Sequence, residues 1–130
     1  MDSLYTSDQL LQIWEKGVAV LGYDSHEYRK DVCGAWMHYS KYGDRNSKYG
    51  WEIDHIYPRK KAEEHHHNAD VLANLRPMQW ENNQMKGLDY PEYKARVRAS
   101  NENDGKNVDD IRKFHVNEQT QQILSQYFEL

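Results

Sequence analysis

Apolar residues recur at helical spacing near both ends of the sequence. Near the start, Thr6 or Ser7 can cap a helix, the apolar residues of 10–14 follow at helical spacing, and Gly17 comes after them. Near the end, residues 119–128 carry one apolar face. These patterns predict a first helix that ends at about Gly17 and a C-terminal helix over about 117–129.

A period of two residues appears in the middle of the chain. In the segment 51–56, Trp51, Ile53 and His55 lie on one face of an extended strand, and the residues between them lie on the other face. This alternation predicts a strand that has one apolar face and ends in a polar Asp-His pair.

A strand and a helix are expected shortly afterwards. Residues 74–79 read as a second strand, with Pro77 at its edge or end. Residues 80–86 form a plausible short helix that Gly87 stops. A charged, histidine-rich loop over 58–70 joins the two strands, and loops of this length are usually functional or mobile. The segment therefore predicts one strand–strand–helix unit, or ββα unit.

The remaining segments carry weaker signals. Residues 18–31 are expected to be irregular, because turn-forming residues interrupt them. A helix is expected to begin at Asp89 or Tyr90, with Pro91 at its first position. Residues 101–110 read as a flexible acidic linker. We expect one α+β domain over residues 1–130, since its 130 residues suit a single modest core.

Composition narrows the classes of protein. Hydrophobic residues make up 38% of the chain, which is enough for a folded domain, and no apolar run is long enough for a membrane helix. The start of the sequence lacks the regions of a signal peptide. Cys33 is the one cysteine, so an internal disulfide and a CxxC zinc pair are both excluded. We expect a cytoplasmic protein that does not contact membranes.

The net charge of −4 argues mildly against nucleic-acid binding, although the distribution of charge matters more than its total. Basic residues gather in two places: Arg59, Lys60 and Lys61 follow the first strand, and four more lie within 86–98. A local basic strip on an acidic protein is consistent with contacts to phosphate.

The Asp-His pair suits phosphodiester hydrolysis. A neutral histidine can take a proton from water at neutral pH, which makes His55 a candidate general base. Asp54 and the Asn83 carbonyl are hard oxygen ligands, which favour Mg²⁺ or Mn²⁺. One objection is geometric: adjacent strand residues point to opposite faces, so a twist or bulge must re-aim Asp54. An isolated Asp-His pair is more often a solvated surface feature, and the longer pattern raises this pair above that expectation.

That longer pattern resembles the HNH nuclease superfamily. The segments EIDHIYP and NLRPMQWENNQMKG are similar to its first strand and to its second strand and helix. The resemblance implies a ββα-metal core and extends, with flanking segments, over about residues 28–90. The Asp-His, Asn, Asn version of the motif also resembles the HNH domain of RNA-guided CRISPR nucleases. The implied roles are metal ligands for Asp54 and Asn83, general base for His55, bracing of the loop and orientation of the base for Asn74, and phosphate contact for Lys86.

The sequence departs from many HNH proteins in lacking two CxxC pairs that bind a structural zinc. Gln79 and Asn82 stand where the second pair would be. No structural zinc is expected, and packing must hold the fold instead. The tryptophans expected to contribute are Trp36, Trp51 and Trp80.

Two features have more than one reading. The run His65 to His67 could bind a transition metal, could contact DNA together with Arg59, Lys60 and Lys61, or is an exposed cluster. Arg76 could stabilise the transition state, or it could pair with Glu52 across the strands. These two readings of Arg76 are equally supported.

The sequence therefore predicts a ββα-metal domain with flanking N- and C-terminal helices that hydrolyses DNA with Mg²⁺ or Mn²⁺. RNA is not excluded as a substrate, because no motif reads the 2′-hydroxyl. The rival readings are a non-catalytic nucleic-acid-binding or protein-interaction module, and an RNase or toxin nuclease. A homodimer or a protein partner is consistent with the C-terminal helix, although that helix can equally pack on its own core.

Overall fold

The two terminal helices are present. The computed structural model describes residues 4–130, with α1 at Ser7–Trp14 and α4 at Glu118–Phe128. Thr6 caps α1 in a capping box, and the Asn117 side chain accepts from the backbone of Thr120 at the start of α4. α1 buries Ile13 and Trp14, and α4 buries Leu124 and Phe128. Both predicted helices are therefore confirmed.

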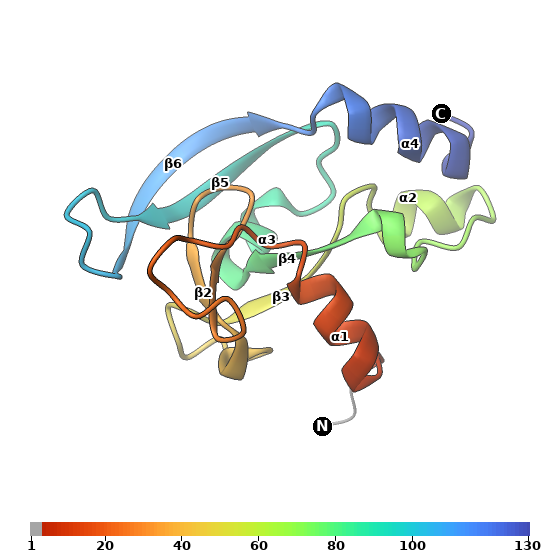
Figure 1. The fold of residues 1–130 in the computed structure, drawn as a ribbon. Coiled ribbons are helices and arrows are strands. Elements are labelled where there is room, and N and C mark those ends of the chain that lie inside the picture. Colours follow the sequence, from red (N-terminus) through yellow and green to blue (C-terminus); the bar gives the residue numbers. More distant parts are fainter. Residues whose placement is uncertain (1–3) are drawn as a thin grey trace.

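The strand–strand–helix unit lies in the middle of the molecule (Figure 1). It consists of β3 (Trp51–His55), β4 (Leu75–Gln79) and α3 (Trp80–Lys86). The strands are antiparallel, and their register runs without a shift from Trp51 opposite Gln79 to His55 opposite Leu75. Both predicted strands and the predicted helix are therefore confirmed, and with them the α+β class.

The C-terminal half differs from the sequence prediction. The helix expected from Asp89 or Tyr90 is the strand β5 (Glu92–Ala99), which follows a cis Tyr90–Pro91 bond. Side chains of β5 alternate between exposed and buried from Glu92 to Val97, a strand period that the sequence analysis missed. Pro91 therefore precedes a strand and does not begin a helix.

The expected linker over 101–110 is also wrong in its second half. Asn107 begins β6 (Asn107–His115), which pairs antiparallel with β5 and forms the long hairpin seen in Figure 1. Only the turn between the strands has the irregular structure that its acidic and glycine residues predicted. Pairing with β5 orders a polar segment that has little intrinsic strand preference.

Two further elements were not predicted. The loop over 58–70 contains a short helix, α2 (Arg59–Glu64), because its residues are good helix formers, Ala62 is buried, and Arg59 pairs with Glu63 one turn later. The segment 18–31 ends in β1 (Tyr28–Lys30), which pairs with β2 (Trp36–His38). One-turn 3-10 helices lie at Tyr39–Lys41 and Leu72–Asn74.

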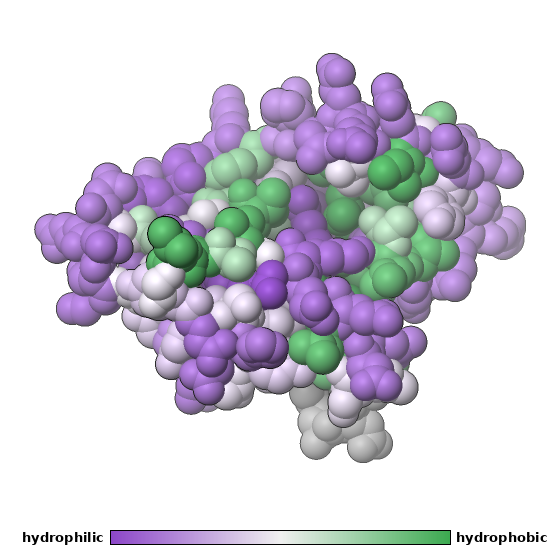
Figure 2. Space-filling view, in the orientation of Figure 1, coloured by the Kyte–Doolittle hydropathy of each residue, from purple (hydrophilic) through white to green (hydrophobic). Residues whose placement is uncertain are grey.

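Two apolar clusters hold these elements together. The larger cluster joins α2 and α4 to β4, β5 and the loops between them, and the smaller one packs Trp14 and Trp51 with Met37. Figure 2 shows hydrophilic residues over most of one face, with apolar residues gathered in patches near its middle. Among residues 4–130, no helix has the length and apolar character needed to cross a membrane.

A buried carboxylate ties the β1–β2 turn to the central unit. Asp31 accepts hydrogen bonds from the backbone amides of Cys33, Ala35 and Gln79 and from Asn82 Nδ2, at 2.9 to 3.1 Å. Asn82 Oδ1 also accepts from two backbone amides of β5. Gln79 and Asn82 stand where many HNH proteins have their second CxxC pair. Here they link the β1–β2 turn to the central unit and to β5 by hydrogen bonds. Of the three tryptophans, Trp36 and Trp51 are buried, and the half-buried Trp80 donates to Ser47.

Candidate functional site

Asp54 and His55 have separate partners at the end of β3. A bulge that could re-aim Asp54 does not occur within the β3–β4 pair, because the register is regular through both residues. In regular extended chain, neighbouring side chains point to opposite faces. Asp54 meets side chains of β4 and α3, whereas His55 meets side chains of α2 and of the loop before Asn74.

A carboxylate and a guanidinium hold the His55 ring. His55 Nε2 lies 2.7 Å from Asp70 Oδ1 and 3.2 Å from Arg59 Nη2. Arg59 Nη2 in turn donates to Asp70 Oδ1 over 2.6 Å. We call these three residues the His55 cluster. The His55 side chain is 17% exposed, so the ring is not fully closed off from solvent.

The cluster favours one tautomer of His55. In a neutral ring, Nε2 cannot both donate to Asp70 and accept from Arg59. The contact with Asp70 is the shorter one and is assisted by the carboxylate charge, so Nε2 carries the hydrogen. Nδ1 is then the basic nitrogen, and no described residue occupies it with a hydrogen bond. This is the arrangement that a general base needs.

Asp70 remains ionised over the pH range in which a histidine acts. Partial burial tends to raise its pKa, but the hydrogen bonds from His55 and Arg59 outweigh that effect and hold the pKa below its usual range. Tyr5 donates to the same oxygen, and burial followed by the charge of Asp70 raises the pKa of Tyr5 to about 12. Tyr5 therefore remains a hydrogen-bond donor to Asp70.

Asp54 lies between two cations on the other side of β3. Its Oδ2 accepts from Arg76 Nε at 2.8 Å, and its Oδ1 lies 3.2 Å from Lys86 Nζ. The Asp54 side chain is 3% exposed and that of Lys86 is fully buried. Lys86 also donates to the carbonyls of His55 and Ile56, so this lysine holds the end of β3 and does not reach a phosphate, contrary to the sequence expectation.

We call Asp54, Arg76 and Lys86 the Asp54 triad. The pKa values of its two cations depend on their burial and on the one carboxylate between them. Burial lowers the pKa of Lys86, and Asp54 offsets only part of the effect. Burial also opposes the charge of Arg76, but Asp54 outweighs it and raises the pKa of Arg76. Arg76 pairs with Asp54, not with Glu52, because it stands directly opposite Asp54 in the register. Arg76 Nη2 is buried and has no hydrogen-bond partner among the described residues.

Arg76 and Lys86 contact both oxygens of Asp54, so a cation there would compete with two positive charges. Asn83, the other predicted ligand, donates through Nδ2 to Glu52 Oε1 at 3.2 Å and has no hydrogen bond with Asp54. A carboxylate and an amide oxygen fit Mg²⁺, which keeps several waters. An ion at Asp54 must replace its contact with Arg76 or with Lys86. Among residues 4–130, no group of three or more His, Cys, Asp or Glu side chains is placed to hold a metal, the three histidines included.

Asn74 braces the loop that leads out of β3. Its side chain accepts from the Tyr57 amide and donates to the carbonyls of Tyr57 and Ala69, at 2.8 to 3.0 Å. Asn74 is fully buried, so it does not touch a substrate. It fixes the loop between β3 and β4, at whose far end Asp70 meets His55.

No family model, curated protein or solved structure matches this chain.

Asp70 is a site residue that the sequence patterns do not indicate. Fifteen positions separate it from His55, and its place in a polar loop distinguishes it little from its neighbours. The available signal was Asn74, a buried asparagine expected to brace this loop, four residues after Asp70. Of the predicted nucleic-acid contacts, Arg59 is 40% exposed beside His55, Lys60 is exposed and Lys61 is half-buried on the same helix, while Arg76 and Lys86 face inward.

Proposed function

We propose that this protein is a divalent-metal-dependent endonuclease that hydrolyses phosphodiester bonds of DNA. The observation that carries the proposal is the geometry of His55, whose ring is oriented by Asp70 and flanked by the exposed Arg59. The resemblance of Asp54, His55, Asn74 and Asn83 to the HNH pattern supports the same reaction.

In the proposed reaction, His55 and Asp70 act on the attacking water, and the basic residues of α2 act on the phosphate. His55 Nδ1 takes a proton from the attacking water, and Asp70 stabilises the imidazolium that forms. Arg59 binds a non-bridging phosphate oxygen and offsets the negative charge that develops there. Lys60 and Lys61 extend the positive potential along α2 and supply salt-dependent affinity for the backbone.

Asp54 and Asn83 are the residues that would hold a metal ion. Mg²⁺ or Mn²⁺ bound there would supply Lewis-acid chemistry to the phosphate beside His55 only if Asp54 left Arg76 and Lys86 and turned to the face of His55.

The test of the proposal is cleavage of supercoiled plasmid. We expect nicking or linearisation with Mg²⁺ or Mn²⁺, loss of cleavage in EDTA, and recovery when the metal is restored. Absence of cleavage under every metal condition would contradict the DNA endonuclease assignment. Structured RNA in the same assay would then distinguish an RNase from a binding module.

Asp70→Asn tests the orientation of the base. The change removes the charge opposite the imidazolium but keeps the shape and the base itself, so we expect cleavage to fall by about tenfold to a hundredfold, less than the about 10²–10⁴-fold that a general base contributes. The pH–rate profiles of both proteins, compared directly, report whether the charge of Asp70 acts on the base. A variant with wild-type rates and an unshifted profile would show that Asp70 does not act through His55.

The same variant has a defined effect on stability. The folded-state pKa of Asp70 is depressed, so its contribution is present above the unfolded value of about 3.9 and is lost as pH falls through the folded pKa. The difference in unfolding free energy between wild type and Asp70→Asn should therefore be largest near neutral pH and vanish in acid. Urea titrations at several pH values measure it.

A further inference from the structure

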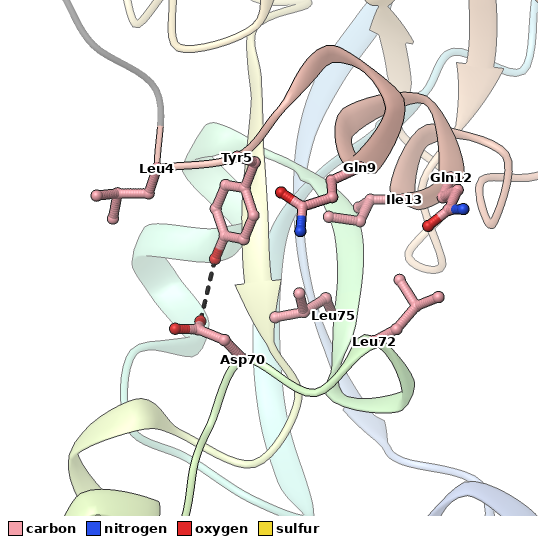
Figure 3. A pocket seen from close by; sticks show the side chains of 8 residues that line it. All are labelled: Leu4, Tyr5, Gln9, Gln12, Ile13, Asp70, Leu72 and Leu75. Atoms are coloured by element: carbon pink, nitrogen blue, oxygen red, sulfur yellow. Dashed lines mark hydrogen bonds between the residues drawn. The ribbon is translucent and has the colours of Figure 1, made fainter.

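A small pocket opens beside the His55 cluster. It has a volume of about 170 Å³ and lies between α1, the Leu72–Asn74 turn and the start of β4. Figure 3 shows Gln9 and Ile13 projecting from α1 toward Leu75, with Tyr5 and Asp70 at one side. Leu72 and Gln12 also line it, and neither the mechanism above nor the sequence motif uses it.

The size of the pocket limits its ligand. Pockets for drug-sized ligands have volumes of about 300–1,000 Å³. A cavity of about 150 Å³ holds a single benzene ring. The pocket therefore suits one flat ring and excludes a base pair.

The lining of the pocket suits a heterocycle. Ile13, Leu72 and Leu75 offer apolar surface, and Tyr5 offers an aromatic ring. The Gln9 carbonyl oxygen accepts from the Thr6 amide, which leaves the Gln9 NH₂ group as a donor. The hydrogen bonds from His55, Arg59 and Tyr5 all reach Asp70 Oδ1, so among residues 4–130 no hydrogen bond occupies Oδ2, which can accept one from a ligand. Donors and acceptors around an apolar slot are what the edge of an unpaired base requires.

The position of the pocket connects it to the reaction. Asp70 lines the pocket and also contacts His55 and Arg59, so a base in the pocket lies one side chain away from the groups assigned to the phosphate. We propose that this pocket binds one unpaired, pyrimidine-sized base next to the scissile phosphate, which makes single-stranded or locally opened nucleic acid the substrate. The proposal rests on the nuclease assignment and deepens it.

The test is binding in EDTA, where cleavage does not interfere. Fluorescence anisotropy compares a fluorescein-labelled thymidine 12-mer with an abasic 12-mer of equal charge. We expect the thymidine strand to bind at least about tenfold more tightly, as one well-stacked base allows. Leu72→Trp, at a half-exposed position, fills the pocket and should abolish this preference.

Ile111→Trp is the matched control, since Ile111 is exposed on β6 and does not line the pocket. It should keep the preference for thymidine. If Leu72→Trp fails to fold, Gln12→Trp fills the same pocket from exposed α1 and serves instead.

Equal affinity for both strands, a preference that survives filling of the pocket, or tighter binding to duplex than to single strand would each overturn the proposal. Plasmid cleavage without a base preference would leave the nuclease assignment intact and would refute base binding by the pocket. A base preference lost on filling the pocket, with no cleavage of any substrate, would support the pocket and refute the nuclease.

Discussion

Replacing His55 with alanine is expected to reduce metal-dependent plasmid cleavage by about 10²–10⁴-fold, the usual contribution of a general base. The loss arises because no other described side chain within the His55 cluster can accept a proton: Asp70 is engaged as a hydrogen-bond acceptor and its pKa is depressed. Initial rates of nicking, measured with saturating Mg²⁺, give the ratio.

The fold should persist in this variant. His55 is partly exposed, and its contact with Asp70 joins a half-exposed pair whose contribution to stability is within about 1 kcal/mol. His26→Ala is the matched control, because the His26 side chain is 85% exposed and lies outside the cluster. A wild-type cleavage rate in His55→Ala, or an equal loss of cleavage in His26→Ala, would show that His55 is not the general base.

Asp54→Ala is expected to lower the free energy of unfolding by about 3–5 kcal/mol, even in EDTA. The change leaves Arg76 and Lys86 buried beside each other with no carboxylate between them, while Arg76 Nη2 already lacks a partner among the described residues. Urea unfolding in EDTA measures this effect without any contribution from a metal. Asp109→Ala, which breaks an exposed pair with Lys48, should stay within about 1 kcal/mol of wild type.

A loss below about 1 kcal/mol in Asp54→Ala would show that the triad does not stabilise the fold. If that variant is too unstable, Asp54→Asn keeps the shape and allows a metal titration. A ligand that binds only the folded state raises the unfolding midpoint. A rise with Mg²⁺ in wild type and none in Asp54→Asn would identify Asp54 as a ligand as well as an ion-pair partner. A rise in both would place the metal elsewhere.

The elements that the sequence predicted correctly are those whose local signals agree. For α1, the cap at Thr6 and the apolar period coincide, and for α3 the helix formers end at Gly87. The strand β3 follows an apolar–polar alternation over Trp51 to Asp54 in the sequence, and it pairs with β4 without a register shift. The strand β5 also has a clear alternation, but Pro91 suggested a helix start, and the strand became evident only from its pairing with β6. Residues of β6 have weak strand preference, so only their partner reveals the strand.

The sequence by itself determined the strand–strand–helix unit, the two terminal helices and the choice of His55 as the candidate base, because each depends on residues that are close along the chain. Only the tertiary structure decided the partners of the charged groups. It turned Lys86 inward to the end of β3, paired Arg76 with Asp54, and brought Asp70 from a distant loop to orient His55. A charge acquires its role from the groups within a few ångströms of it, and those groups are set by how the elements pack.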